Sequence, residues 1–308
     1  MFTKRTDLAI EAHELWQESA GKTTRLAGVR ATEKKIQGYP VTRVDILNQE
    51  GEAALGKPAG SYRTLDLTAF WQRGDGFFDR AVRAVGQQVK ELTPDSGPVL
   101  VVGLGNRAMT PDAVGPLAAD SILITRHLID AMPQHFSGFR PVAALRPGVL
   151  GTTGVESAEA VRGLVDRLHP SAVIAVDALA ARSSKRIAST IQIADTGITP
   201  GSGVGNHRKA LDRGTLGVPV VAVGVPLVVY ASTIAADALC ALGEGEVEEE
   251  RIAACVERVV SEKLGEMIVT PREVDALVER MAGVLADGIN QALHPRLSRD
   301  EIAQMMAQ

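Results

Sequence analysis

The sequence predicts an α/β protein with a central, mostly parallel, twisted sheet that is flanked by helices. From residue 99 onward, short runs of Val, Ile, Leu and Ala alternate with stretches of helical periodicity, which is typical of this class. The runs at 99–105 and 172–176 are apolar enough to form buried strands. Hydrophobic residues make up 45% of the 308 residues and aromatic ones only 4%, so we expect a sizeable core of aliphatic side chains.

The first part of the chain predicts a helix followed by a smaller β-rich portion. Residues 1–20 are polar and predict a helical lead segment. In residues 21–75, short runs are broken by Gly and Pro, and the segments 41–48 and 61–67 alternate as half-exposed strands do. We expect this portion to pack against the main sheet.

The central part, residues 96–242, predicts the α/β core. The expected strands are 99–104, 140–145, 172–177, 190–194 and 218–224, and the expected helices are 77–92, 113–131, 154–168 and 231–242.

Residues 243–308 predict C-terminal helices. The charged run 243–251 indicates a solvated helix start, and 271–293 indicates a long amphipathic helix with Pro271 in its first turn.

Composition excludes several classes of protein. The net charge of −4 lacks the basic footprint of a nucleic-acid binder. The two cysteines, Cys240 and Cys255, offer neither a disulfide framework nor a metal-binding spacing. The N-terminus has no secretory signal, and no apolar run is long enough to cross a bilayer. These features predict a protein of a reducing, cytoplasmic compartment.

Two aspartates are the strongest candidates for a functional site. Asp177 directly follows the apolar run 172–176, and Asp112 follows the run 99–105 in GLGNRAMTPDAVGP. Ligands and reacting groups of open α/β sheets gather where strands end, and a buried carboxylate is costly without a partner. Two converging carboxylates can share a proton and perform acid–base chemistry. A helix cap is the alternative for each, more so for Asp112, which precedes a helical stretch.

Other chemistries find less support in the sequence. None of the six histidines has an HExxH or other paired spacing, although His127 lies on the predicted helix after Asp112 and leaves a metal role open. There is no GxSxG motif of a serine hydrolase. The loop 197–206 lacks the GK[ST] ending of a phosphate-binding loop, and the role of its Gly201–Asn206 part stays open.

Long segments of the chain occur in a fixed order. They are RTDLAIEA (5–12), GLGN with TPDAVGP (103–116), LITRHL (123–128), RPVAALRPGVLGTTGVES (140–157), IAVDALAARS (174–183), TIQIADTGITPGSGVGNHRKAL (190–211), TLGVPVVAVGVP (215–226) and MIVTPREVDALVERMAGVLADGINQALH (267–294). Together these segments resemble the germination protease family of spore-forming bacteria, whose members degrade small acid-soluble spore proteins. The resemblance extends over nearly the whole chain and is weakest at 20–95 and 243–265.

The resemblance implies an atypical aspartic-type endopeptidase that starts the degradation of these proteins during germination, with a fold similar to that of the hydrogenase-maturation proteases. It implies Asp112 and Asp177 as the catalytic pair, without showing which is acid and which is base. Asn106, Arg126 and Arg182 are expected to support the pair or bind substrate. No metal or cofactor is expected.

The resemblance also implies a zymogen. Residues 1–7 would be a propeptide, cut between Asp7 and Leu8, and residues 8–308 a single peptidase domain. Cleavage there would follow an acidic residue and precede an apolar one, as in the family's substrates. A helix start capped by Thr6 or Asp7 is the alternative for this segment. We further expect a homotetramer in the cytoplasm of the forespore or spore core, without direct nucleic-acid or membrane partners.

Two other functions fit the same residues. The first is a metal-sensing maturation protease of the same fold, which would need a set of metal ligands. The second is a non-catalytic spore protein, against which the presence of both Asp112 and Asp177 argues.

Overall fold

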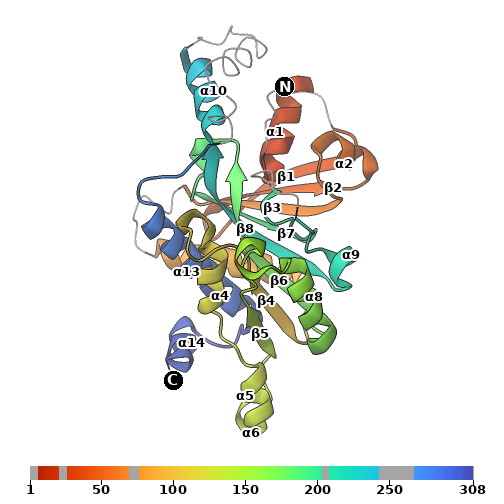
Figure 1. Cartoon of the computed structure of the whole chain (residues 1–308), viewed down its shortest axis with the longest axis vertical. Helices are drawn as coiled ribbons and strands as arrows, with labels where there is room; N and C mark the ends of the chain where they lie inside the picture. The colour runs from red at the N-terminus through yellow and green to blue at the C-terminus, as the bar shows by residue number, and fades with distance from the viewer. Residues whose placement is uncertain (1–5, 21–25, 69–75, 203–207, 243–266, 308) are drawn as a thin grey trace.

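A single mixed sheet of nine strands forms the centre of the molecule (Figure 1). The computed structural model describes residues 6–20, 26–68, 76–202, 208–242 and 267–307. The strand order is β1-β2-β3-β7-β8-β6-β4-β5, and β9 pairs with β8. The strands are β1 (Val29–Ile36), β2 (Tyr39–Ile46), β3 (Gly60–Asp66), β4 (Val99–Gly103), β5 (Val142–Leu145), β6 (Ala172–Ala181), β7 (Thr190–Ala194), β8 (Val220–Tyr230) and β9 (Ile268–Val269).

The part of the sheet around β4 and β6 is parallel and buried on both faces. β5, β4, β6 and β8 run in the same direction, with Val101 paired to Ile174 and Ile174 to Val221. All five residues of β4 are buried, as its continuous run of apolar residues predicts. The expectation of an α/β fold with a parallel centre and flanking helices is confirmed.

The β-rich N-terminal portion extends the same sheet instead of packing against it as a separate unit. β1, β2 and β3 form an antiparallel meander, and β3 pairs with β7, which is antiparallel to β8. β1 and α2 (Gln49–Leu55) were not expected from the sequence. β1 is exposed along most of its length, so it lacks an apolar pattern that could identify it.

Helices cover both faces of the sheet. On one face, α3 (Phe77–Leu92), α4 (Val114–Asp120) and α13 (Val274–Leu293) pack on Val99 and Val101. On the other, α8 (Ser157–Leu168) packs on Leu100 and Val102. The remaining helices include α1 (Ala9–Ala20), α5 (Arg126–Ala131), α6 (Pro133–Phe136), α7 (Leu150–Thr153), α9 (Arg213–Leu216), α10 (Ala231–Leu242) and α14 (Arg299–Met306).

The helix expected over 113–131 is wrong, because the chain breaks between α4 and α5. The side chain of Asn290 on α13 accepts the N–H of Leu123 at 2.9 Å and donates to the carbonyl of Ser121 at 2.9 Å. Thr125 accepts the N–H of Val142 in β5 at 3.0 Å. These distant partners satisfy the backbone groups that the break exposes, so helical periodicity alone does not reveal it.

Two central strands continue further than their apolar runs indicate. β6 extends to Ala181 and β8 to Tyr230, whereas β4 ends at Gly103, opposite Val176. The sequence predicts a strand that ends at Asp177. In the structure Asp177 lies within β6 instead, because the strand continues to Ala181. The charged run 243–251 lies outside the described residues.

Candidate active site

Asp177 lies in β6 at the point where the neighbouring strand β4 has ended. Ile174 and Val176 face the helices α3 and α13, so the alternation of the strand directs Asp177 to the opposite face. Its side chain is 4% exposed, and one carboxyl oxygen accepts the N–H of Ala178 at 2.9 Å. The position combines a buried acid with a strand edge that β4 no longer covers.

Asp112 reaches the same region from a short 3₁₀ turn, Thr110–Asp112, after β4. Its carboxylate accepts the backbone N–H of Asn106 at 2.8 Å and so closes the loop on itself. No side chain caps α4, so the structure does not support a helix-capping role for Asp112. Gly105 has a φ of +110° in this loop, and a Cβ there would lie 2.1 Å from the carbonyl oxygen of Asp112.

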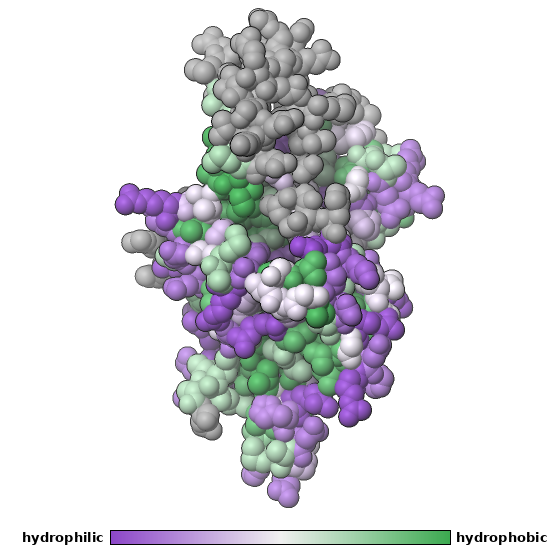
Figure 2. Space-filling model, viewed as in Figure 1, coloured by the Kyte–Doolittle hydropathy of each residue, from purple (hydrophilic) through white to green (hydrophobic). Residues whose placement is uncertain are grey.

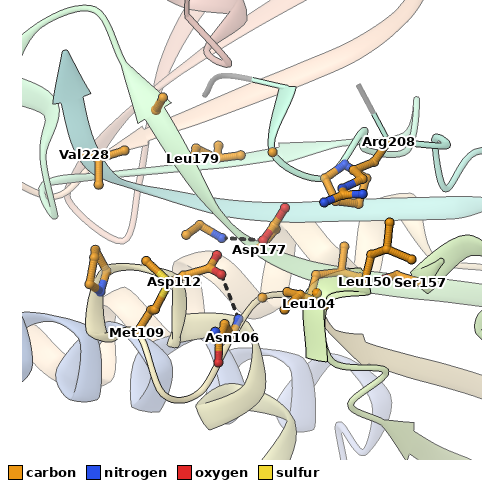
Figure 3. Close-up of a pocket in the computed structure, with 18 of the residues that line it drawn as sticks. Leu104, Asn106, Met109, Asp112, Leu150, Ser157, Asp177, Leu179, Arg208 and Val228 are labelled. Atoms are coloured by element: carbon orange, nitrogen blue, oxygen red, sulfur yellow. Dashed lines mark hydrogen bonds between the residues drawn. The ribbon is translucent and has the colours of Figure 1, made fainter. Parts of the chain in front are cut away.

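Both aspartates line one cavity of about 350 Å³ (Figure 3). The close-up shows the two side chains reaching into it from different elements, Asp112 from its loop and Asp177 from β6. Apolar side chains form much of the wall, among them Leu104, Met109, Leu150, Leu179 and Val228. Because apolar walls raise the strength of electrostatic interactions, the two carboxyl groups influence one another there.

Burial raises the pKa of both carboxyl groups. For Asp177 the pKa lies well above its ordinary value, because of burial first and of the negative charges of Asp112 and Asp7 second. For half-buried Asp112, burial raises the pKa while the hydrogen bond from Asn106 opposes this rise. Asp177 is thus the member of the pair that holds a proton at higher pH.

The other site residues expected from the sequence have different places. Asn106 lines the cavity and holds Asp112 through its backbone. Arg126 is exposed at the start of α5 and lines a separate cavity with His127. Arg182 lies beside α1, with its guanidinium 3.8 Å from the carboxylate of Glu18. The structure therefore brings Asn106 to the pair, and Arg126 and Arg182 are not among the residues that line its cavity.

The N-terminal segment, residues 6–8, lies against the part of β6 that extends beyond the end of β4. The N–H of Asp7 donates to the carbonyl of Ala180 at 3.1 Å, and its carboxylate accepts the N–H of Ala180 at 2.8 Å. Ser202 donates to the other carboxyl oxygen at 2.7 Å. Asp7 itself lines the cavity of Asp112 and Asp177, so this segment occupies part of the candidate site.

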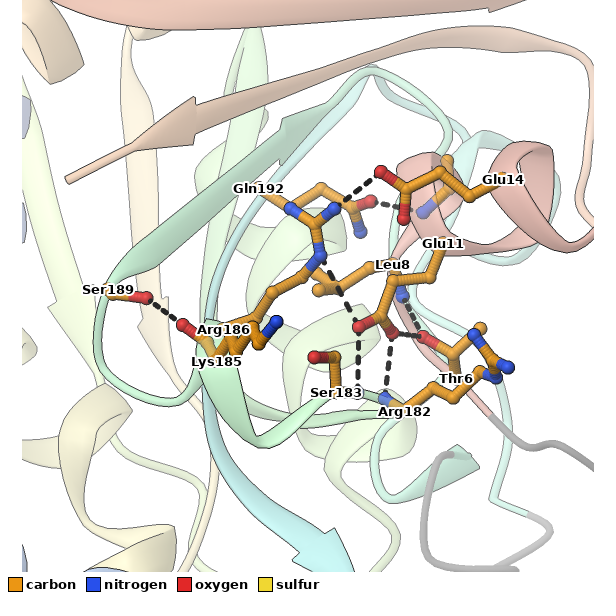
Figure 4. A network of polar contacts seen from close by, with 11 residues as sticks. Thr6, Leu8, Glu11, Glu14, Arg182, Ser183, Lys185, Arg186, Ser189 and Gln192 are labelled. Atoms are coloured by element: carbon orange, nitrogen blue, oxygen red, sulfur yellow. Dashed lines mark hydrogen bonds and ion pairs between the residues drawn. The ribbon is translucent and has the colours of Figure 1, made fainter. Parts of the chain in front are cut away.

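Glu11 holds the beginning of α1 against the residues that directly follow β6 (Figure 4). It is 1% exposed, and its carboxylate accepts the N–H groups of Arg182 at 2.7 Å and Ser183 at 3.0 Å. Thr6 donates to Glu11 and accepts the N–H of Leu8 at 3.0 Å. Thr6 thus makes a local bond of the kind that a helix start uses, while Asp7 bonds to β6.

Several site residues were not expected from the sequence. Arg208 and Glu156 line the cavity and form an ion pair at 3.5 Å, and exposed Lys209 lies beside them. Lys57 and Gln192 contact the N-terminal segment. The basic pair Arg208–Lys209 follows the glycine-rich loop in the sequence and was a usable signal. Of that loop, residues 203–207 lie outside the described part.

Two further findings concern the described residues alone. Their side chains contain no group of three or more His, Cys, Asp or Glu placed to hold a metal ion. None of their helices is both long and apolar enough to span a membrane.

Comparison with known proteins assigns the family. A family model described as germination protease matches residues 9–244 and 239–306. A germination protease of Clostridium perfringens is 39% identical over 99% of this chain and 100% of its own length. One from Caldanaerobacter subterraneus is 41% identical over 98% of both chains, and one from Bacillus cereus is 37% identical over 97% and 96%.

A solved structure is also similar. The [NiFe] hydrogenase maturation protease HycI from Thermococcus kodakarensis matches 66% of this chain and 98% of its own, with a TM-score of 0.36 and 16% identity.

The fold and the sequence matches define a peptidase of the α/β class. The chain belongs to the germination protease family and has a protease role in spore germination.

Replacement of Asp177 by Asn should stabilise the protein at neutral pH. A carboxyl group whose pKa is higher in the folded than in the unfolded state destabilises the fold as pH rises from the unfolded pKa, about 3.9, through the folded one. The amide has no charge to bury, so the melting temperature of Asp177→Asn should exceed that of the wild type at pH 8. The difference should shrink toward pH 4. An equal difference at both pH values would contradict the raised pKa.

Proposed function

We propose that this protein is an endopeptidase that starts the degradation of small acid-soluble spore proteins, with Asp112 and Asp177 as an acid–base pair. The observation that carries the proposal is the convergence of both carboxyl groups on one largely apolar cavity. Family membership supports the substrate class. The forespore or spore core is the corresponding location.

The different surroundings of the two carboxyl groups suggest their roles. Asp177 retains its proton more strongly, because it is buried and faces the charges of Asp112 and Asp7. It would polarise the carbonyl of the bond to be cut and then donate to the leaving amine. Asp112, which is less buried, would take a proton from the attacking water. The pair would titrate as a coupled unit.

The N-terminal segment supports a zymogen that processes itself. Asp7 lies in the cavity of the pair, and Leu8 is fully buried against Leu179, Ala181 and Val229. A cut between Asp7 and Leu8 would free Asp7 from Ala180 and Ser202, while Leu8 and α1 stay packed. The vacated part of the cavity would then admit a protein substrate.

Asparagine at either member of the pair should abolish proteolysis. Asp112→Asn and Asp177→Asn should each lower kcat on a small acid-soluble spore protein by about 100-fold or more, because an amide neither takes up nor supplies the required proton. Asp130→Asn, which changes an exposed carboxylate on α5, is the matched control. Near-normal cleavage by a folded Asp112 or Asp177 variant would mean that this residue has a structural role.

The same assay tests the alternative of a metal-dependent maturation protease. Chelators should leave the activity unchanged. Loss of activity in EDTA and its return with one particular metal would favour the alternative.

Self-processing should start the mature chain at Leu8. We expect N-terminal sequencing of matured protein to begin there, and Asp7→Lys to slow the cut, since lysine cannot accept the hydrogen bonds from Ala180 and Ser202. Glu18→Lys, an exposed charge reversal on α1, should mature normally. A fully active enzyme that retains Met1 would refute the zymogen.

We also propose a homotetramer. Ile234 on α10, Ile268 on β9 and Met267 just before β9 are exposed large hydrophobic residues. The two segments are neighbours, since the N–H of Ala231 on α10 donates to the carbonyl of Met267 at 2.8 Å. The space-filling view shows apolar side chains gathered over this end of the sheet (Figure 2). Closed symmetric assemblies commonly bury such surfaces.

Light scattering should therefore give four times the chain mass of 32.6 kDa. Ile268→Asp should reduce the assembly, because it puts a charge into the proposed contact. Met306→Asp, an equal change on the distant helix α14, should not. A monomer mass for the wild-type protein at working concentration would contradict the proposal.

A further inference from the structure

The carbonyl oxygen of Asp7 is held by two side chains that the catalytic proposal does not use. The ammonium group of Lys57 donates to it at 3.0 Å, and so does the side-chain amide of Gln192. Lys57 also donates to the carbonyl of Thr6 at 3.3 Å. One backbone carbonyl thus receives two donors, of which one is cationic.

Gln192 forms hydrogen bonds with the backbone on both sides of Leu8. Its amide nitrogen donates to the carbonyl of Asp7, and its amide oxygen accepts the N–H of Ala9 at 2.7 Å. The side chain is only 8% exposed, and Leu8 between these two bonds is fully buried. The peptide bond from Asp7 to Leu8 is therefore held in one defined orientation.

The strand register places Gln192 and Asp177 in the same row of the sheet. Gln192 of β7 pairs with Gly224 of β8, and Gly224 pairs with Asp177 of β6. Paired residues of neighbouring strands project to the same face. The donor to the Asp7 carbonyl and the buried acid of the cavity therefore project from one face, separated by a glycine.

Lys57 lies just after the end of α2. Gly56 adopts a left-handed φ of +63° and ends the helix, and the next residue, Lys57, is half-buried. Burial lowers the pKa of Lys57, while the charges of Asp7 and Glu11 act to raise it. A partly desolvated cation interacts more strongly with a carbonyl dipole than one in water does.

We propose that Lys57 and Gln192 form an oxyanion site for the bond between Asp7 and Leu8. The inference rests on the proposed self-processing and adds residues to it. Both donors lie 3.0 Å from the carbonyl oxygen of the uncut bond, the atom on which the negative charge develops during hydrolysis. They stabilise the negative charge that develops on the Asp7 oxygen as the carbonyl carbon becomes tetrahedral.

The reaction that they assist is hydrolysis. The oxygen of a water molecule bonds to the carbonyl carbon of Asp7, and one proton of the water passes to a carboxylate of the pair. The bond to the nitrogen of Leu8 then breaks, and the other carboxyl group gives that nitrogen a proton. After proton exchange the products are the α-carboxylate of Asp7 and the ammonium group of Leu8.

If Lys57 only anchored the leader, its removal would change the activity of the uncut chain in a different way. If Lys57 only ties the leader down, its removal loosens the leader and opens the cavity, so the uncut chain gains activity on another protein. If Lys57 stabilises the oxyanion, its removal slows the cut and leaves the uncut chain inactive.

The test follows release of Met1–Asp7 from the full chain as a first-order process. Lys57→Met and Gln192→Leu should each slow release by about 100-fold, the usual loss for one such donor, and the uncut variants should not digest a small acid-soluble spore protein. Lys57→Arg, which retains a cationic donor, should recover part of the rate. Lys35→Met, an exposed lysine on β1, should match the wild type. Circular dichroism confirms that each variant is folded.

Three outcomes separate the possibilities. Release at the wild-type rate in folded Lys57→Met and Gln192→Leu overturns the oxyanion site, and so does activity of the uncut variants on the spore protein. Asp177→Asn is measured in parallel. If Asp177→Asn releases the leader normally, the proposed catalytic pair itself fails; if it does not and Lys57→Met does, only the present inference fails.

Discussion

The unequal lengths of β4 and β6 are the constraint on which the site depends. β4 ends at Gly103, opposite Val176, whereas β6 continues to Ala181. The first residue of β6 beyond this pairing is Asp177, and the following backbone lacks a β4 neighbour. A cavity for the carboxyl pair and backbone groups that can bind another peptide segment both follow from this difference. The N-terminal segment uses those groups, since Asp7 bonds to Ala180 and Glu11 to Arg182 and Ser183.

Electrostatics connects the N-terminal segment with the pair. Asp177 is already disfavoured as an anion by burial, and both Asp112 and Asp7 add negative charge. Loss of Asp7 would remove one of these charges and lower the pKa of Asp177, which burial and Asp112 would still keep raised. The same cut would leave Lys57 without the Thr6 and Asp7 carbonyls to which it donates. Removal of one short segment would thus change the charge balance on both sides of the cavity.

The position of Asp112 depends on close contact between backbones. A Cβ at Gly115 on α4 would lie 2.2 Å from the carbonyl of Leu104 and 2.4 Å from that of Val176, so only glycine lets α4 approach the strand ends this closely. The loop of Asp112 is thereby pressed against β6. GLGN and DAVGP could be recognised in the sequence as a motif, but the reason for their glycines is a contact between segments that are distant in the chain.

The family resemblance proposed Asp112 and Asp177 as a pair. Local pattern alone was enough for the aliphatic strands of the sheet, for α3 and most of α13, and for the position of the two carboxylates after apolar runs. These rest on periodicity and on carboxylates beside apolar runs, which are short-range properties. The break after α4, the extension of β6 beyond Asp177 and the contacts of Lys57 and Gln192 with Asp7 were decided by tertiary structure. Each depends on a partner far away in sequence: Asn290 for the break, the early end of β4 for the extension, and Asp7 for the two donors. A hydrogen bond between residues 185 positions apart, such as that from Gln192 to Asp7, leaves no periodic signal in the sequence, because only folding brings its two ends together.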